Sequence, residues 1–102
     1  MIVYWTQFAE DKLQDIYRFY SEVATEKIAF KLVNGIVETT INLSENPDLG
    51  PIEQLLIERD QNFRSLIYKK YKIIYWVNLE FNRIEIANVF DCRQNPEMIK
   101  KF

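Results

Sequence analysis

Apolar positions divide the chain into a helical first half and a strand-rich second half. Residues 2–5 form a short apolar run rich in β-forming side chains, which predicts a strand. Thr6 follows as a candidate N-cap, so a helix is predicted from about Gln7 to Glu22. Its apolar residues have the spacing of a single helical face: Leu13, Ile16, Tyr17 and Tyr20.

A second helix is predicted from about Thr25 to Leu43, and the short break at residues 24–25 makes the two helices a hairpin. Two apolar stripes run along this helix, one through Ile28, Leu32, Ile36 and Leu43 and the other through Phe30, Val33, Val37 and Ile41. Two stripes predict two packing partners, such as the first helix and a sheet. Gly35 lies inside the helix at a cost of about 1 kcal/mol relative to alanine, which predicts a close approach of the other helix.

Three strand-like runs follow the turn-forming segment 46–51. Side chains alternate along residues 63–68, 71–78 and 84–90, and the links between the runs have the length of hairpin turns. The run 71–78 is apolar on both faces, so it is expected at the centre of a sheet that is covered on both sides. Pro96 is expected to begin one helical turn near the end of the sequence.

The element order β-α-α-β-β-β predicts a single α+β domain over residues 1–102. The helical hairpin is expected to pack on one face of a mainly antiparallel sheet. Both helices and the central strands are expected to supply the core: Ile16, Tyr20, Leu32, Ile36, Ile73, Tyr75 and Ile86. Trp5 and Trp76 are also expected to pack in the core rather than to stack on a ligand.

The types of side chain present narrow the possible chemistry. The chain has no histidine, and its one cysteine is Cys92. Histidine-based acid-base pairs, histidine zinc sites, thiolate metal clusters and an internal disulfide are therefore excluded. Any catalysis has to use lysine, arginine, tyrosine or carboxylate groups, and no metal or cofactor is expected. No signal peptide or membrane span is evident, so the cytoplasm is the expected location and no membrane partner is expected.

Charge is distributed unevenly along the chain. Residues 1–60 contain five Lys/Arg and eleven Asp/Glu, a balance of −6, whereas residues 61–102 contain eight Lys/Arg and four Asp/Glu, a balance of +4. A basic second half suggests an anionic partner, either nucleic acid or an acidic peptide. Ordinary surface charge on a strand-rich half is the alternative.

Short motifs are spread in order over nearly the whole chain. They include Val3-x-Trp5-Thr6-x-x-Ala9, Leu43-x-x-x-Pro47-x-x-Gly50, Tyr71-Lys72-Ile73-Ile74-Tyr75, and Ile86-x-x-Val89-Phe90-Asp91-x-Arg93-Gln94-Asn95-Pro96. Together they resemble the ParE-like branch of the RelE/ParE superfamily, the toxins of type II toxin-antitoxin (plasmid stabilisation) systems. The resemblance implies a helical hairpin on a curved sheet, growth arrest by the free toxin, and a cognate antitoxin whose C-terminal segment wraps the toxin.

The resemblance also implies a choice between two mechanisms. ParE-like members poison DNA gyrase by binding it, which makes a gyrase-binding toxin the leading interpretation. RelE-like members are ribosome-dependent mRNA endonucleases that use basic strand residues, a second arginine near the last strand, and a tyrosine or histidine acid. On matching positions this chain has Arg64, Lys70 or Lys72, and Arg93, so Arg64, Lys72 and Arg93 are the candidate catalytic residues of that alternative.

The chain departs from the RelE-like pattern at three places. Phe90 stands where many relatives have histidine, Cys92 stands where many have a second arginine, and no tyrosine or histidine follows Pro96. A missing proton donor removes a factor of roughly 10²–10⁴ from acid-base cleavage. Cys92 itself is expected to be an inert small side chain. A decayed toxin that only binds its antitoxin is the third interpretation.

The basic residues also suggest a docking surface. Arg64, Lys70, Lys72 and Arg93 are predicted to converge on the sheet side and the adjoining loop, where they would receive the acidic tail of the antitoxin. Two alternatives stand beside this hypothesis. Arg64 would lie on a solvated strand face, and Arg93 would hold the Asp91 loop by an ion pair. Any nucleic acid would be involved only indirectly.

Overall fold

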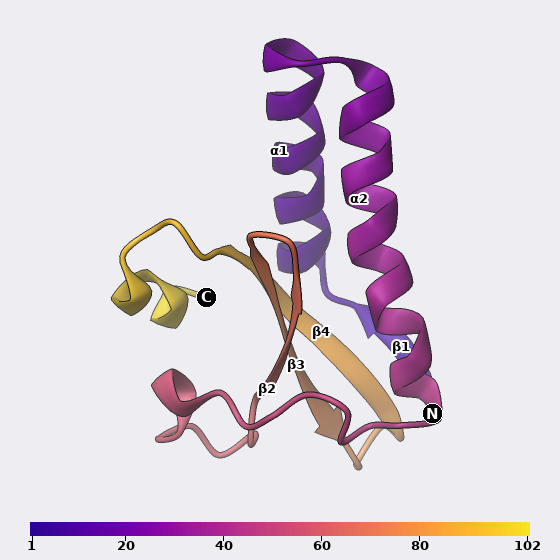
Figure 1. Ribbon diagram of the computed structural model, residues 1–102. Helices are drawn as coiled ribbons and strands as arrows, with labels where there is room; N and C mark the ends of the chain where they lie inside the picture. The colour runs from indigo at the N-terminus through magenta and orange to yellow at the C-terminus, as the bar shows by residue number, and fades with distance from the viewer.

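The regular elements follow the order that the sequence predicts (Figure 1). The computed structural model describes all 102 residues. Its strands and α-helices are β1 Ile2–Trp5, α1 Gln7–Val23, α2 Glu26–Ile41, β2 Arg64–Tyr68, β3 Tyr71–Asn78 and β4 Arg83–Asp91. Short 3₁₀ helices are η1 Asn42–Ser44, η2 Gln54–Leu56 and η3 Pro96–Lys100. The helical turn that begins at Pro96 is therefore confirmed.

Side-chain caps set the beginning of both helices. The Thr6 hydroxyl accepts a hydrogen bond from the Ala9 backbone N–H at 3.2 Å, and Thr25 does the same for Ile28 at 3.1 Å. These caps satisfy backbone donors that the first helical turn leaves free. Helix α2 ends two residues earlier than predicted, because the chain tightens there into the 3₁₀ helix η1.

The four strands form one sheet in the order β1-β4-β3-β2. Strands β2, β3 and β4 pair antiparallel through short turns, while β1 pairs parallel with β4. The expected mainly antiparallel sheet is confirmed. Parallel pairing of β1 requires a long return path, since only a crossover connection can bring two parallel strands together.

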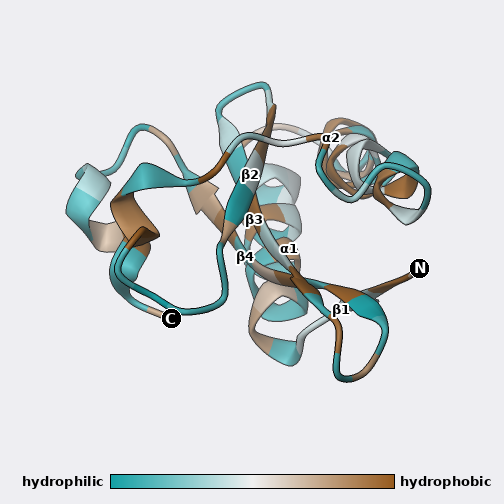
Figure 2. Ribbon diagram, turned by 90° about the horizontal axis from the view of Figure 1, so that it is seen from below, coloured by the Kyte–Doolittle hydropathy of each residue, from teal (hydrophilic) through white to brown (hydrophobic).

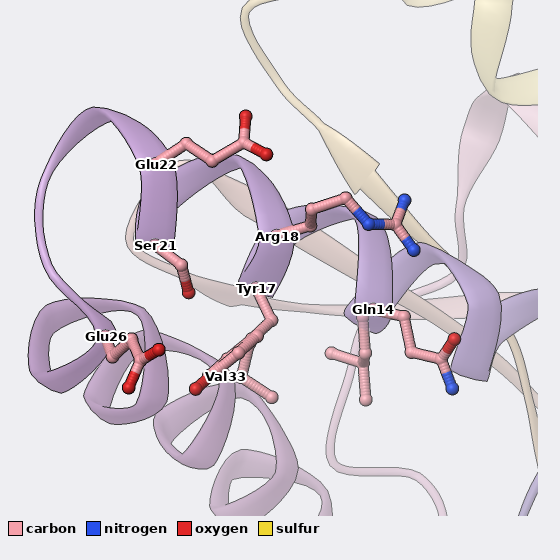
Figure 3. Close-up of a pocket in the computed structure, with 8 residues that line it drawn as sticks. Gln14, Tyr17, Arg18, Ser21, Glu22, Glu26 and Val33 are labelled. Atoms are coloured by element: carbon pink, nitrogen blue, oxygen red, sulfur yellow. The ribbon is translucent and has the colours of Figure 1, made fainter.

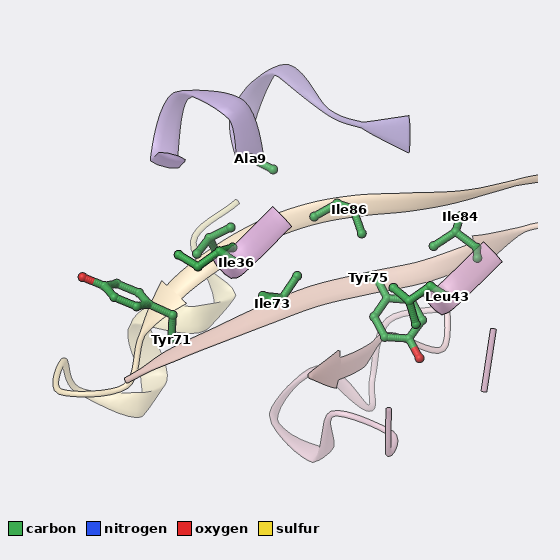
Figure 4. Packing of buried hydrophobic residues seen from close by; sticks show 9 residues of the cluster. Ala9, Ile36, Leu43, Tyr71, Ile73, Tyr75, Ile84 and Ile86 are labelled. Carbon is green, nitrogen blue, oxygen red and sulfur yellow. The ribbon is translucent and has the colours of Figure 1, made fainter. Parts of the chain in front are cut away.

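Strand β3 lies between two hydrophobic layers, as its two apolar faces predict. Towards the helices, Ile73 and Tyr75 are fully buried with residues of α2, η1 and β4 (Figure 4). On the opposite face, Ile74 packs in a second cluster with Phe63 and Ile99. The turns η2 and η3 supply this second cover, on the other side of the sheet from α2 (Figure 2).

A register shift between β3 and β4 allows both layers to be filled. Ile74 pairs with Asn88 and Tyr75 with Ile86, so Ala87 is an extra residue on β4. Strand residues an odd number of positions apart normally point to opposite faces. The bulge reverses this, and Ile86 and Val89 both join the helix-side cluster.

The hairpin covers less of the sheet than the sequence suggests. Ile36, Ile73, Tyr75 and Ile86 are fully buried as predicted, but Ile16, Tyr20 and Leu32 are only half-buried at the margin of the core. The reason is geometric, because the tip of the hairpin extends beyond the sheet (Figure 1). The second stripe of α2 is likewise only partly covered, with Phe30 and Ile41 exposed.

The expected reason for Gly35 is wrong. A Cβ atom at this position would overlap the phenol of Tyr68 on strand β2. The close approach at Gly35 is therefore between α2 and the sheet, not between the two helices. Since a strand side chain occupies the space, no local pattern in the helix could have identified the partner.

Candidate functional site

A polar cleft of about 380 Å³ opens where helix α1 crosses the start of β3 and the end of β4. Its lining combines aromatic, basic and acidic side chains: Lys12, Asp15, Ile16, Phe19, Tyr20, Tyr71, Val89, Asp91, Arg93 and Gln94. Helix α1 contributes the residues at helical spacing, and the ends of the two strands contribute the others. We call this the tyrosine cleft.

Two phenols and an ion pair form the centre of the tyrosine cleft. Arg93 binds the Asp91 carboxylate through two nitrogens, at 2.9 Å and 2.7 Å, and donates to the Tyr20 hydroxyl at 3.3 Å. The Tyr71 hydroxyl donates to the same Tyr20 oxygen at 3.5 Å. Two donors on one phenol oxygen favour its charged form.

The hydrogen bonds and burial in this network shift the pKa values of Tyr20 and Tyr71 in opposite directions. The hydrogen bond from Tyr71, followed by that from Arg93, lowers the pKa of Tyr20, whereas burial, followed by the bond to Tyr20, raises the pKa of Tyr71. The hydrogen bond from Arg93 lowers the pKa of Asp91. Tyr20 is thus the member of the pair that loses its proton first.

Lys12 closes one side of the tyrosine cleft. Burial lowers the pKa of its ammonium group, and the nearby carboxylates of Asp15 and Asp91 oppose that shift. Its Nζ atom donates to the Val89 carbonyl at 3.5 Å. The two cations and two carboxylates that line the cleft balance in formal charge.

A second cavity of about 400 Å³ adjoins the tyrosine cleft, because Tyr20 and Tyr71 line both. Its other lining residues are Ile28, Lys31, Leu32, Lys69 and Lys70. It contains three lysines and no carboxylate, and none of these lysines forms an ion pair. We call it the lysine pocket.

Arg64 supports a loop. Its guanidinium donates to the Gly50 carbonyl at 2.8 Å and lies 3.6 Å from the Asp48 carboxylate. Tyr75 holds the same loop from below, donating to Pro47 at 2.8 Å and accepting from the Gly50 N–H at 2.9 Å. Burial raises the pKa of Tyr75, which keeps the donating proton in place.

Lys72 supports a different segment. Its Nζ atom lies 2.7 Å from a carboxylate oxygen of Glu53, a side chain that is only 4% exposed. The other oxygen of Glu53 accepts the Leu55 N–H at 3.2 Å. The ammonium group of Lys72 is thereby committed to anchoring the turn η2.

The predicted convergence of the four basic residues is not formed. Arg64 lies opposite Tyr75 and Lys72 opposite Ile67, three steps apart along the ladder, so the two side chains leave opposite faces of the sheet. Lys70 lines the lysine pocket and Arg93 lines the tyrosine cleft, so these two do lie on either side of the same tyrosines. Their role in partner binding stays a prediction.

The sequence alone pointed to other roles for several of these residues. Tyr20 was expected in the core, and Lys12, Lys31 and Lys69 were not singled out. One feature of the sequence could have indicated the role of Tyr20. It lies at the end of the apolar stripe of α1, where the hydroxyl of a tyrosine can accept a hydrogen bond from a neighbouring side chain. The ion pair of Arg93 with Asp91, weighed above as an alternative, is present.

A third cavity, of about 540 Å³, lies between helices α1 and α2 (Figure 3). Leu13, Tyr17 and Val33 provide its apolar surface, and Arg18 and two glutamates provide mixed charge. The Ser21 hydroxyl is buried beside it without a hydrogen-bond partner. No nucleophile and base are paired here, so the groove offers a surface for binding rather than for chemistry.

Two further features bear on the class of protein. No helix is both long enough and apolar enough to span a bilayer. No three histidine, cysteine, aspartate or glutamate side chains gather where a metal ion could be held.

A family model described as "ParE toxin of type II toxin-antitoxin system, parDE" matches residues 3–96. The chain belongs to the ParE toxin family. The resemblance of the sequence motifs to ParE-like toxins is thereby confirmed. A solved structure titled "Chromosomal ParDE TA system from P. aeruginosa" is similar to this ParE-family chain, with a TM-score of 0.74 and 24% identity over 89% of this chain and 95% of the other. That likeness confirms the fold. Among curated proteins, none matches this ParE-family chain.

Proposed function

We propose that this ParE-family toxin arrests growth by binding DNA gyrase and that a cognate antitoxin neutralises it. The family match over residues 3–96 carries the proposal. The placement of the basic residues supports binding over RNA cleavage. Arg64 and Lys72, the strand residues expected to face a scissile phosphate, are occupied with Gly50 and Glu53 on opposite faces of the sheet.

The test is inducible expression of the toxin in bacteria with and without its neighbouring gene product. We expect growth to stop, plasmid supercoiling to fall and transcripts to stay intact, and we expect co-expression of the antitoxin to reverse both effects. Purified toxin should inhibit supercoiling by purified gyrase. Growth arrest with cut transcripts and normal supercoiling would contradict the proposal, and so would unimpaired growth with antitoxin binding retained, which is the behaviour of a decayed toxin.

The tyrosine cleft favours one second candidate, the ribosome-dependent mRNA endonuclease. Tyr20, whose pKa is lowered, sits within hydrogen-bond reach of Arg93, and Lys12 lines the same cleft. A phenol with a lowered pKa can exchange a proton, and the guanidinium of Arg93, which stays charged, would bind a phosphate. Primer extension on ribosome-bound message decides between the two: defined cleavage that Tyr20→Phe and Arg93→Ala abolish would establish the endonuclease and displace the gyrase mechanism.

A further inference from the structure

We infer that the lysine pocket is the docking site for an acidic segment of the antitoxin that inserts a large apolar side chain between helix α2 and the β2–β3 turn. The inference rests on the proposed function only in naming the antitoxin as the owner of that segment. The pocket itself, and the chemistry of what fits it, follow from side chains that three separate parts of the chain bring together.

The floor of the lysine pocket is apolar. Ile28 and Leu32 lie one turn apart on helix α2, and Tyr20 and Tyr71 form the wall towards the tyrosine cleft. Ile28 is 52% exposed, although it belongs to an apolar stripe of the helix. An exposed apolar surface inside a cavity gains from being covered by an apolar side chain of a partner.

The rim of the lysine pocket carries a single sign of charge. Lys31 projects from the same helix, and Lys69 and Lys70 form the turn between β2 and β3. The chain as a whole has 15 acidic and 13 basic residues, so three lysines without a carboxylate are a local exception. A partner with carboxylates complements this rim, and such complementarity speeds and orients docking.

A peptide fits the lysine pocket better than a nucleic acid does. Proteins that bind single-stranded nucleic acid without sequence preference combine a basic groove with exposed aromatic faces on which bases stack. Tyr71 is only 4% exposed, and the hydroxyls of both tyrosines are engaged with each other. A short acidic segment with one large apolar side chain fits both parts of the pocket, because the apolar side chain would cover the floor and the carboxylates would pair with the lysines of the rim.

The charge part of the inference is tested by association kinetics between full-length toxin and antitoxin. The test variant is Lys31→Glu with Lys70→Glu, and its matched control is Lys27→Glu with Lys101→Glu, which changes the same charge at exposed positions outside the pocket. At about 0.1 M salt we expect the test variant to associate about tenfold more slowly than the control. The gap should close at about 1 M salt, where the screening length falls to about 3 Å.

The apolar part is tested by dissociation kinetics. Ile28→Ser removes one of the two aliphatic side chains in the floor of the lysine pocket, and Phe30→Ser removes a similarly exposed apolar side chain from the same helix outside it. We expect Ile28→Ser to raise the dissociation rate about tenfold, because affinity differences in one interface reside mainly in dissociation, and Phe30→Ser to leave it within about twofold.

Binding of probes and growth assays separate the possible failures. A labelled peptide of alternating glutamate and leucine should bind and compete with antitoxin, whereas a glutamate-serine peptide should not. Tighter binding of a single-stranded oligoribonucleotide, lost in the Lys31/Lys70 variant, would overturn the inference. So would wild-type association of that variant, even if the toxin arrests growth and is neutralised normally. If the kinetics follow the expectation but free toxin leaves growth and gyrase unaffected, the docking site stands and the proposed function fails.

Discussion

Two groups of basic side chains in this protein have the same sign of charge but different surroundings. Arg64 and Lys72 on the sheet are each bound to a loop or turn, through Gly50 and through the buried carboxylate of Glu53. The three lysines around the lysine pocket have no ion-pair partner in the chain. The first group holds parts of the fold together, whereas the second contributes no ion pair to it. Closeness in sequence therefore does not show that basic residues belong to one binding surface.

The largest effect on stability is expected at Lys72. Lys72→Ala leaves the Glu53 carboxylate buried without its cation, which costs roughly 2–4 kcal/mol of unfolding free energy. Urea denaturation measures the change. Lys70→Ala, two residues away and unpaired, is the control and should unfold like wild type. Equal losses in the two variants would erase the distinction between the groups.

A smaller loss is expected at Arg64. Arg64→Ala removes a charged hydrogen bond to the Gly50 carbonyl, and because this side chain is partly exposed the cost should be about 1.5 kcal/mol. Arg64→Lys keeps the charge near Asp48 without the forked donor, so it should recover only part of the loss. Hydrogen exchange at the Gly50 amide reports the loop directly. Unchanged protection in Arg64→Ala would show that Tyr75 alone holds it.

Replacing Arg93 should change the pKa values of its neighbours far more than the free energy of unfolding, because its ion pair with Asp91 is exposed to solvent. Arg93→Ala should raise the pKa of Tyr20 and that of Asp91, because both lose a hydrogen bond from the guanidinium. Because the pKa of Asp91 is lower in the folded protein than its ordinary value of 3.8, this carboxylate stabilises the fold at pH values above 3.8. The stabilisation is lost as the pH falls through the pKa of Asp91 in the folded protein. That acid-dependent part should shrink in Arg93→Ala, in which only the backbone N–H of residue 93 and the charge of Lys70 still lower the pKa of Asp91. NMR titration of labelled tyrosine and aspartate measures the shifts, and unshifted signals would contradict the network.

The smallest change in stability is expected where the effect on binding is largest. Reversing Lys31 and Lys70 to glutamate breaks no ion pair, so the unfolding free energy should stay within about 0.5 kcal/mol of wild type. Thermal unfolding of the purified variant checks this. A clear loss of stability would mean that these lysines support the fold in the way Lys72 does.

Local patterns were sufficient for the elements and their order. The helical spacing of α1, the cap Thr6 and the turn-forming segment 46–51 act over a few residues, so they can be read in sequence. Thr25, expected as the first residue of the second helix, is its N-cap. The two apolar faces of β3 likewise predicted a central strand with cover on both sides, which the two clusters confirm.

The candidate sites depended on information that no local pattern contains. The bulge at Ala87 reverses the face of the sheet on which each later side chain of β4 lies. The Tyr68 phenol occupies the space that a Cβ atom at Gly35 would need. The tyrosine cleft needs Tyr20 and Arg93, which are 73 positions apart, to meet at 3.3 Å. Such contacts depend on register and on how far the hairpin extends past the sheet, and both are set by packing.

By itself, the sequence determined the element order, the central strand and the membership in a toxin family, because periodicity, capping and motif order are properties of the chain. Only the tertiary structure decided which charges are free. Whether Lys72 meets Glu53, or Lys31 meets no carboxylate at all, is settled by the faces and distances that folding creates. The physical reason is that a charge is neutralised by what lies within a few ångströms in space, and neighbours in space are chosen by burial of the apolar layers rather than by position along the chain.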